Sequence, residues 1–347
     1  MTSGLRLLLV LLVVAGGACD RDRRSPIDPT PTPDPGLPAP PAAAGTFLSG
    51  SAVDAISGTP VAGVSIRVAG FEPVSSGVDG RFSIGGEPPG TRQNRAVTAS
   101  SSSTIERATW IRVPGDEVYL SLIPASFDLS SFDAMFRGEG ALRRWARRPA
   151  LVIERSALAF TATDAASAIA TGDVMDDAEA QRLADDLAWA LGALTGGTYD
   201  TFSDVRIQAS PAGATVPTNQ GDVIFAARYD GLSASKQYEG YTRWFWNGGG
   251  ELVRATLMLD RDYDATALQT RRRALRAHEL GHALGWRHIE SRTSVMNPVG
   301  PAEPTDFDRA GAAIAFQRPP LNRTPDVDAS ASTVNRDNGR IYSAGAP

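Results

Sequence analysis

Residues 278–288 of the 347-residue chain read HELGHALGWRH, and they hold all three of its histidines. Residues four positions apart on an α-helix are separated by about 40° around the axis and about 6 Å along it. The imidazoles of His278 and His282 can therefore point at one metal ion. Glu279 lies beside the same face, near enough to reach a water on that ion.

The third histidine requires a reversal of the chain. On an unbroken helix, His288 would lie about 15 Å along the axis from His278 and could not bind the same ion. Gly285 stands where the helix has to end, and glycine adopts positive φ at little cost. The spacing therefore predicts a helix that ends near Gly285 and a turn that returns His288 to the other two rings. The alternative, three histidines packed in a core, is disfavoured because this spacing rarely arises by accident.

The complete pattern has a known counterpart. His-Glu-x-x-His-x-x-Gly-x-x-His resembles the zinc signature of the metzincin peptidases. The stretch SVMNP at residues 294–298 resembles the Met-turn of that family, and its Met-x-Pro form is similar to the matrixin branch. The resemblance implies one catalytic Zn²⁺ held by His278, His282 and His288. It also implies that Met296 forms an apolar floor below the ligands without coordinating the ion.

The resemblance implies a zinc-dependent endopeptidase. Three neutral imidazoles leave Zn²⁺ an open position for a water, whose pKa the ion lowers while it polarises the scissile carbonyl. Glu279 is then expected to act as general base, taking the proton of the water and handing it to the leaving amine. Two family features are missing. Pro298 stands where several branches place a tyrosine, and Cys19 is the only cysteine, which excludes latency through a thiolate on the zinc.

Two other classes of function compete with the peptidase. One is a catalytically inactive, metzincin-like surface lipoprotein that binds protein or peptide, and Glu279 argues against it because only catalysis needs an acid there. The other is an adhesion protein with a structural zinc. Structural zinc usually has four closed protein ligands, and the chain offers no fourth histidine and no suitable cysteine.

Residues 125–318 have the pattern of a mixed α+β domain. Apolar alternation predicts strands at 151–154, 205–209, 223–229, 242–246 and 252–260. Capping-box spacing predicts three helices, which begin after Asp176, Thr266 and Thr305. The second of these carries the histidines. The order of elements resembles the metzincin fold and implies a five-stranded mixed sheet, an active-site helix and a small C-terminal subdomain.

A strand near the histidine helix is the candidate for substrate binding. Metzincins bind a peptide as an added strand on the edge of the sheet above the cleft. The resemblance makes residues 242–246 the edge candidate, and the side chains of Arg243, Trp244, Phe245 and Trp246 are candidates to line subsites. The alternative is that the two tryptophans only pack one face of a strand.

The segments before residue 125 predict export and a separate domain. Residues 1–19 read as a signal peptide that ends in small residues before Cys19, which resembles the lipidation site of bacterial lipoproteins. Residues 20–45 form a Pro-rich linker that favours extended polyproline II. Residues 46–124 predict a small all-β sandwich. The stretches GTPVAGV at 58–64 and DGRF at 79–82 resemble carboxypeptidase-regulatory-like domains.

Composition limits the partners. A net charge of −5 points to no nucleic-acid partner, and a single cysteine allows no intrachain disulfide. We expect a monomer that acts on a peptide or protein substrate and contacts the membrane through a lipid anchor at Cys19. It would lie in the bacterial cell envelope, periplasmic or on the outer surface, or be secreted if Cys19 is not lipidated. Residues 319–347 are expected to form an extended or disordered tail.

Overall fold

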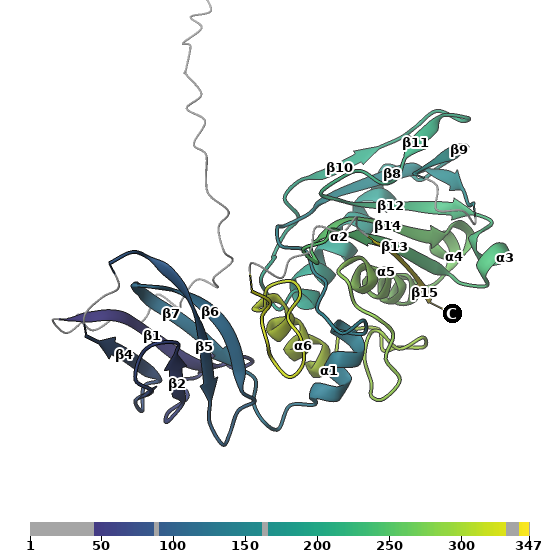
Figure 1. The fold of residues 1–347 in the computed structure, drawn as a ribbon. Helices are drawn as coiled ribbons and strands as arrows, with labels where there is room; N and C mark the ends of the chain where they lie inside the picture. The colour runs from purple at the N-terminus through teal and green to yellow at the C-terminus, as the bar shows by residue number, and fades with distance from the viewer. Residues whose placement is uncertain (1–44, 87–89, 162–165, 331–339, 347) are drawn as a thin grey trace, which may run out of the picture.

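The computed structural model describes residues 45–86, 90–161, 166–330 and 340–346 (Figure 1). The predicted signal peptide, Cys19 and nearly all of the Pro-rich linker lie outside the described residues. The structure combines helices with several β-sheets, which confirms the α+β class. Among the described helices, none has the length and apolar character needed to cross a membrane.

The N-terminal part consists of two small sheets around one apolar core. The strands are β1 (Thr46–Asp54), β2 (Ser65–Val68), β3 (Val74–Ser75), β4 (Arg81–Gly85), β5 (Gln93–Ser100), β6 (Arg107–Val113) and β7 (Gly115–Leu122). One sheet has the order β4-β1-β7 and the other the order β3-β2-β5-β6. Alternate residues of β2 and β4 are buried, as expected for strands with one face on a core. That core includes Leu48, Ile66 and Leu120.

The remaining strands form one large sheet. They are β8 (Ala150–Ala159), β9 (Ser167–Val174), β10 (Val205–Gln208), β11 (Thr215–Pro217), β12 (Val223–Asp230), β13 (Gly240–Trp246), β14 (Leu252–Asp260) and β15 (Arg340–Ala346). Their order is β11-β9-β8-β12-β14-β13-β15, and β10 also pairs with β8. β10, β8, β12 and β14 run parallel, whereas β13 is antiparallel to β14.

The prediction of five strands in this sheet was too low, because the described residues contribute eight. β8 is longer than its predicted core of 151–154. Its first half pairs with β10 and its second half with β9, so that two strands lie along the same side of one long strand. β9 in turn pairs with β11, and β15 adds the eighth strand on the far side of β13.

The helices are α1 (Leu129–Phe136), α2 (Asp177–Leu194), α3 (Leu232–Lys236), α4 (Arg261–Thr266), α5 (Gln269–Ala283) and α6 (Asp306–Phe316). Asp176 caps α2, and Thr305 with Asp308 forms a capping box on α6, which confirms both predicted starts. The predicted cap at Thr266 was wrong. Its hydroxyl donates to the Asp262 carbonyl within α4, and α5 begins after Leu268 without a side-chain cap.

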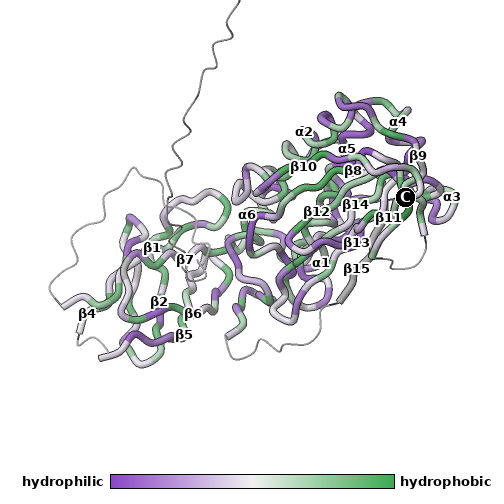
Figure 2. The backbone as a smooth tube through the Cα atoms, turned by 90° about the horizontal axis from the view of Figure 1, so that it is seen from above, coloured by the Kyte–Doolittle hydropathy of each residue, from purple (hydrophilic) through white to green (hydrophobic). Residues whose placement is uncertain are grey.

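The large sheet has two differently covered faces. α2 and α5 pack against each other and belong with Leu257, Leu259 and Ile224 to the principal core. The alternate residues Met258, Phe225 and Ala227 belong to a smaller core on the opposite face. Apolar segments along β8 and β12 lie inside the molecule in Figure 2. α5, which carries the histidines, is therefore fixed by apolar packing on one known face of the sheet.

The chain after α6 is packed rather than extended or disordered in its first part. Arg318 pairs with Asp326 at 2.7 Å, and both side chains are fully buried. Arg107 of β6 pairs with Asp326 at 3.1 Å and with Asp328 at 2.8 Å. These charges, which the sequence pattern did not reveal, hold the segment between the N-terminal sheets and α6. We call Arg107, Arg318, Asp326 and Asp328 the tail cluster.

Candidate metal centre

The three histidine rings converge on one point. The Nε2 atom of His288 lies 3.1 Å from Nε2 of His278 and 3.1 Å from Nε2 of His282. Within the part of the chain that the structure describes, this is the one group of three or more His, Cys, Asp or Glu residues placed to hold a metal ion. The chain reversal predicted from the spacing is therefore present.

Backbone contacts fix two of the rings through their other nitrogen. Nδ1 of His278 lies 2.8 Å from the Val295 carbonyl oxygen, and Nδ1 of His282 lies 2.8 Å from that of Trp286. A carbonyl can only accept, so each Nδ1 carries the proton and donates it. Each Nε2 then carries a lone pair, and both atoms face Nε2 of His288.

The protonation states suit a metal ligand. Burial lowers the pKa of His278 to about 4. Burial also lowers the pKa of His282 well below its ordinary value, and it lowers the pKa of His288. All three imidazoles are therefore neutral near pH 7, which is the form that binds metal ions.

This donor set fits Zn²⁺. Nε2 of His288 is 3.1 Å from each of the other two Nε2 atoms, and the three ligand atoms all lie within 4.8 Å of one another. Nitrogens bound to one tetrahedral zinc at about 2.0–2.1 Å lie about 3.3 Å from each other, close to the two separations that involve His288. The described residues supply three ligands, so a tetrahedral ion would keep one position open.

Gly285 makes the return of His288 possible. Its φ is +97°, a conformation that other residues adopt at a cost. A Cβ atom at this position would also come within 2.5 Å of the Arg143 carbonyl oxygen. The Trp286 amide donates to the Gly281 carbonyl at 2.9 Å, which closes the helix end in the manner of a Schellman motif. Glycine is required here both by φ and by space.

The turn that contains Met296 lies directly against the histidine helix. Met296 is fully buried, and a Cβ atom on Gly281 would meet its sulfur at 2.4 Å. Gly281, between the first two histidines, therefore permits this close contact. Buried Asp308 of α6 holds the turn, because it accepts hydrogen bonds from the Ser294 hydroxyl at 2.5 Å and the Val295 amide at 2.9 Å.

Glu279 is buried against strand β13. Its Oε2 atom accepts a hydrogen bond of 2.6 Å from the Thr242 hydroxyl, and both side chains have 0% exposure. A Cβ atom on Gly240 would lie 2.4 Å from Oε1 of Glu279, so only glycine leaves room for the carboxylate. Sequence reasoning missed Gly240 and Thr242. The available signal was a glycine just before the predicted strand 242–246, since glycine at a strand often marks a close backbone approach.

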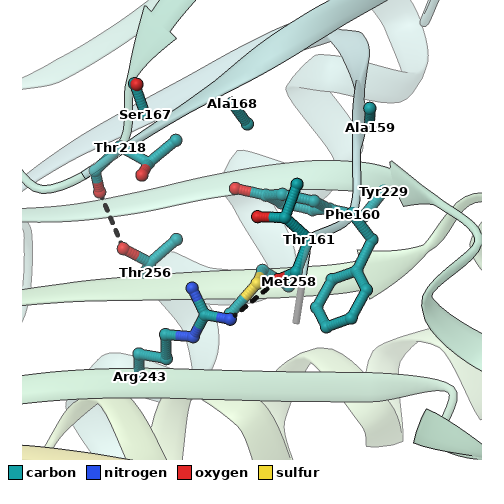
Figure 3. A pocket seen from close by; sticks show the side chains of 10 residues that line it. All are labelled: Ala159, Phe160, Thr161, Ser167, Ala168, Thr218, Tyr229, Arg243, Thr256 and Met258. Carbon is teal, nitrogen blue, oxygen red and sulfur yellow. Dashed lines mark hydrogen bonds between the residues drawn. The ribbon is translucent and has the colours of Figure 1, made fainter. Parts of the chain in front are cut away.

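The candidate substrate strand places its side chains on both faces of the sheet. Trp244 and Trp246 are buried in the principal core, as in the packing alternative. Arg243 points to the opposite face, where its guanidinium donates to the Thr161 carbonyl at 3.2 Å at the edge of a small pocket (Figure 3). Phe245 lies on that face too, with the Arg254 guanidinium 4.1 Å from its ring centre. β15 pairs with the outer side of this strand, which was expected to be open.

No protein-family model matches the chain, and no curated protein matches it either. What the protein does is therefore inferred from its own residues.

Proposed function

We propose that the protein is a zinc-dependent endopeptidase of the metzincin type, closest to the matrixin branch. One observation carries this proposal: three histidines bring their Nε2 atoms together while backbone carbonyls hold the opposite nitrogens of two of them. The proposal is supported by the order of strands and helices, which resembles the metzincin catalytic domain.

The mechanism assigns each role to a residue of this chain. His278, His282 and His288 would hold the ion, which when bound lowers the pKa of a water and polarises the scissile carbonyl. Glu279 takes the proton of the attacking water and passes it to the leaving amine. Thr242 orients the Glu279 carboxylate through its hydrogen bond to Oε2.

The remaining parts of the proposal concern location and organisation. We propose a lipoprotein anchored through Cys19 in the bacterial cell envelope, with residues 20–45 as a spacer. The β-sandwich before residue 125 then serves as a rigid extension of the catalytic domain rather than a second enzyme. Its contacts with the tail cluster support this role, because buried ion pairs link β6 to the segment after α6.

Cleavage of casein or gelatin by the purified protein tests the proposal. We expect turnover that a zinc chelator abolishes and that added zinc restores. Glu279→Gln should lower turnover by about a thousandfold or more while one zinc per chain stays bound, because removing the base leaves the ligands intact. Glu303→Gln, a matched change at an exposed glutamate, should change neither. Cleavage that survives both the chelator and Glu279→Gln would refute the mechanism.

A further inference from the structure

We propose that strand β15, residues 340–346, is an internal occupant of the peptide-binding edge of the sheet and masks Glu279. This inference rests on the proposed function, because it assigns a regulator to the same site. The partner that fits the outer side of β13 is an extended peptide, and the chain supplies one itself.

Backbone pairing carries the inference. β15 runs antiparallel to β13 in an unbroken register, from Trp246 opposite Arg340 to Gly240 opposite Ala346. β14 pairs with the other side of β13, so β15 uses the one side that remains for an added strand. Figure 1 shows β15 next to α5 at this end of the sheet, and the two elements are in contact.

The pairing reaches the catalytic group. Ala344 is opposite Thr242, whose hydroxyl binds Glu279, and Ala346 is opposite Gly240, whose missing side chain makes room for the same carboxylate. Glu279 has 0% exposure in this arrangement. A general base has to reach the water whose proton it takes, and a peptide has to lie beside it. The last three residues of β15 therefore occupy the backbone positions that a substrate needs.

β15 can mask the edge of β13 without binding it tightly, because both strands belong to one chain. The tail cluster fixes the chain at Asp328, twelve residues before β15 begins at Arg340. A short tether keeps a bound segment at an effective concentration in the millimolar range, so that weak pairing suffices. A substrate then competes with β15 for the edge of β13. Its apparent affinity is reduced in proportion to the fraction of molecules in which β15 is detached.

Disrupting the strand in the full chain tests the mask. Proline removes a backbone N–H, and in an antiparallel edge strand the N–H groups of successive residues point alternately toward and away from the neighbouring strand. The double variant Ser343→Pro/Ala344→Pro therefore removes one N–H that donates to β13, whichever of the two it is. We expect KM for a peptide substrate to fall by about tenfold, with kcat and zinc content unchanged. A variant that ends at residue 339 should behave in the same way. Ser332→Pro/Thr333→Pro, at positions before β15, is the matched control and should keep the wild-type KM.

A binding measurement separates this inference from the proposed peptidase activity. A fluorescent peptide with the sequence of residues 340–347 should bind the shortened Glu279→Gln protein and should bind the full-length Glu279→Gln protein at least about tenfold more weakly. That result supports the mask even if no variant cleaves any substrate. Equal binding to both proteins, or no binding to either, overturns the mask even if the wild type is an active peptidase. An unchanged KM in both strand variants also overturns it.

Discussion

Two buried polar clusters in this molecule, the tail cluster and the three histidines, differ in how their polar atoms are paired. In the tail cluster, the guanidinium groups of Arg107 and Arg318 meet the carboxylates of Asp326 and Asp328 at 2.7–3.1 Å. In the histidine centre, two Nδ1 atoms donate to carbonyls and the Nε2 atoms only face one another. The first group pairs opposite charges within the chain, and the second brings together imidazole nitrogens of the kind that bind metal ions.

This difference separates a structural cluster from a ligand site. Burial does not distinguish the two kinds of site, because Arg318, Asp326 and His282 all have 0% exposure. What differs is whether donors and acceptors match. Buried charges that pair internally hold elements together, although such pairs add little net stability over an apolar contact. Buried imidazole nitrogens that converge on one point could hold a metal ion, which is the role that we propose for the histidine centre.

The largest expected effect is loss of metal from His282→Ala. The variant keeps two ligands of three, and we expect its zinc affinity to fall by at least about a hundredfold, because changes to supporting residues alone cost about 10–100-fold. Equilibrium dialysis with metal analysis measures this. Arg318→Met, in the tail cluster, should bind zinc as the wild type does once it is folded. Stoichiometric, tight zinc in His282→Ala would erase the distinction between the two groups.

Asp326→Asn should have the converse effect. It leaves two buried guanidinium groups short of a negative partner, and breaking one side of a buried pair costs about 3–5 kcal/mol. Urea denaturation followed by tryptophan fluorescence measures the loss, and zinc binding by the folded protein should not change. Asp200→Asn, at a side chain that is 86% exposed, is the control and should leave stability unaltered. A stability loss equal to that of the control would contradict the assignment.

Lowering the pH should reduce the stability contributed by the two clusters in separate pH ranges. The pKa of buried His278 lies at about 4 against an ordinary 6.5, so between these values the unfolded chain binds the proton and the folded chain does not. Stability of the metal-free protein therefore falls as pH drops from about 6.5 to 4, by about 1.4 kcal/mol per pH unit for each such histidine.

The tail cluster responds at lower pH. Burial raises the pKa of Asp326, but Arg318 and Arg107 outweigh this and hold it below its ordinary 3.8. Its stabilising contribution is therefore complete above pH 3.8 and is lost as pH falls through the depressed value. Denaturation midpoints between pH 7 and 3 should show two phases. His282→Ala should reduce only the upper phase and Asp326→Asn only the lower, and a single merged phase would argue against this separation.

Local spacing predicted the histidine centre well. The three histidines, Gly285 and the caps of α2 and α6 depend on residues within about ten positions of one another, where helix geometry fixes the distances. The false cap at Thr266 shows the limit of such patterns. The same hydroxyl had a second acceptor one turn back in its own helix, and it bonded there.

Contacts between distant segments could not be predicted in this way. Arg107 and Asp326 are 219 positions apart, and no local pattern links them. The same holds for Thr242 beside Glu279 and for β15 beside β13, because strand pairing depends on the whole topology. Small residues in β9 and β15 also gave a weak apolar period, which explains why the sheet was predicted with too few strands.

The smallest effect concerns a residue that the sequence did not reveal. Thr242→Val keeps the shape of the side chain and removes the hydroxyl that binds Glu279 at 2.6 Å. A hydrogen bond to a charged group is worth about 1.5–3 kcal/mol, and only the part that orients the base affects turnover. We expect kcat to fall by about tenfold, with KM and zinc content unchanged, and Thr242→Ser to restore it.

Thr256→Val provides the matched comparison for this variant. Thr256 lies on the neighbouring strand β14, and its hydroxyl donates to the Thr218 carbonyl at 2.7 Å on the opposite face of the sheet (Figure 3). Each variant deletes one buried threonine hydroxyl, so both proteins should lose similar stability. Only Thr242→Val should also lose turnover. Stopped-flow or steady-state kinetics beside thermal denaturation separates the two quantities. If both variants lost kcat in proportion to stability, Thr242 would be a packing residue like Thr256. The hydrogen bond from Thr242 would then have no part in orienting Glu279.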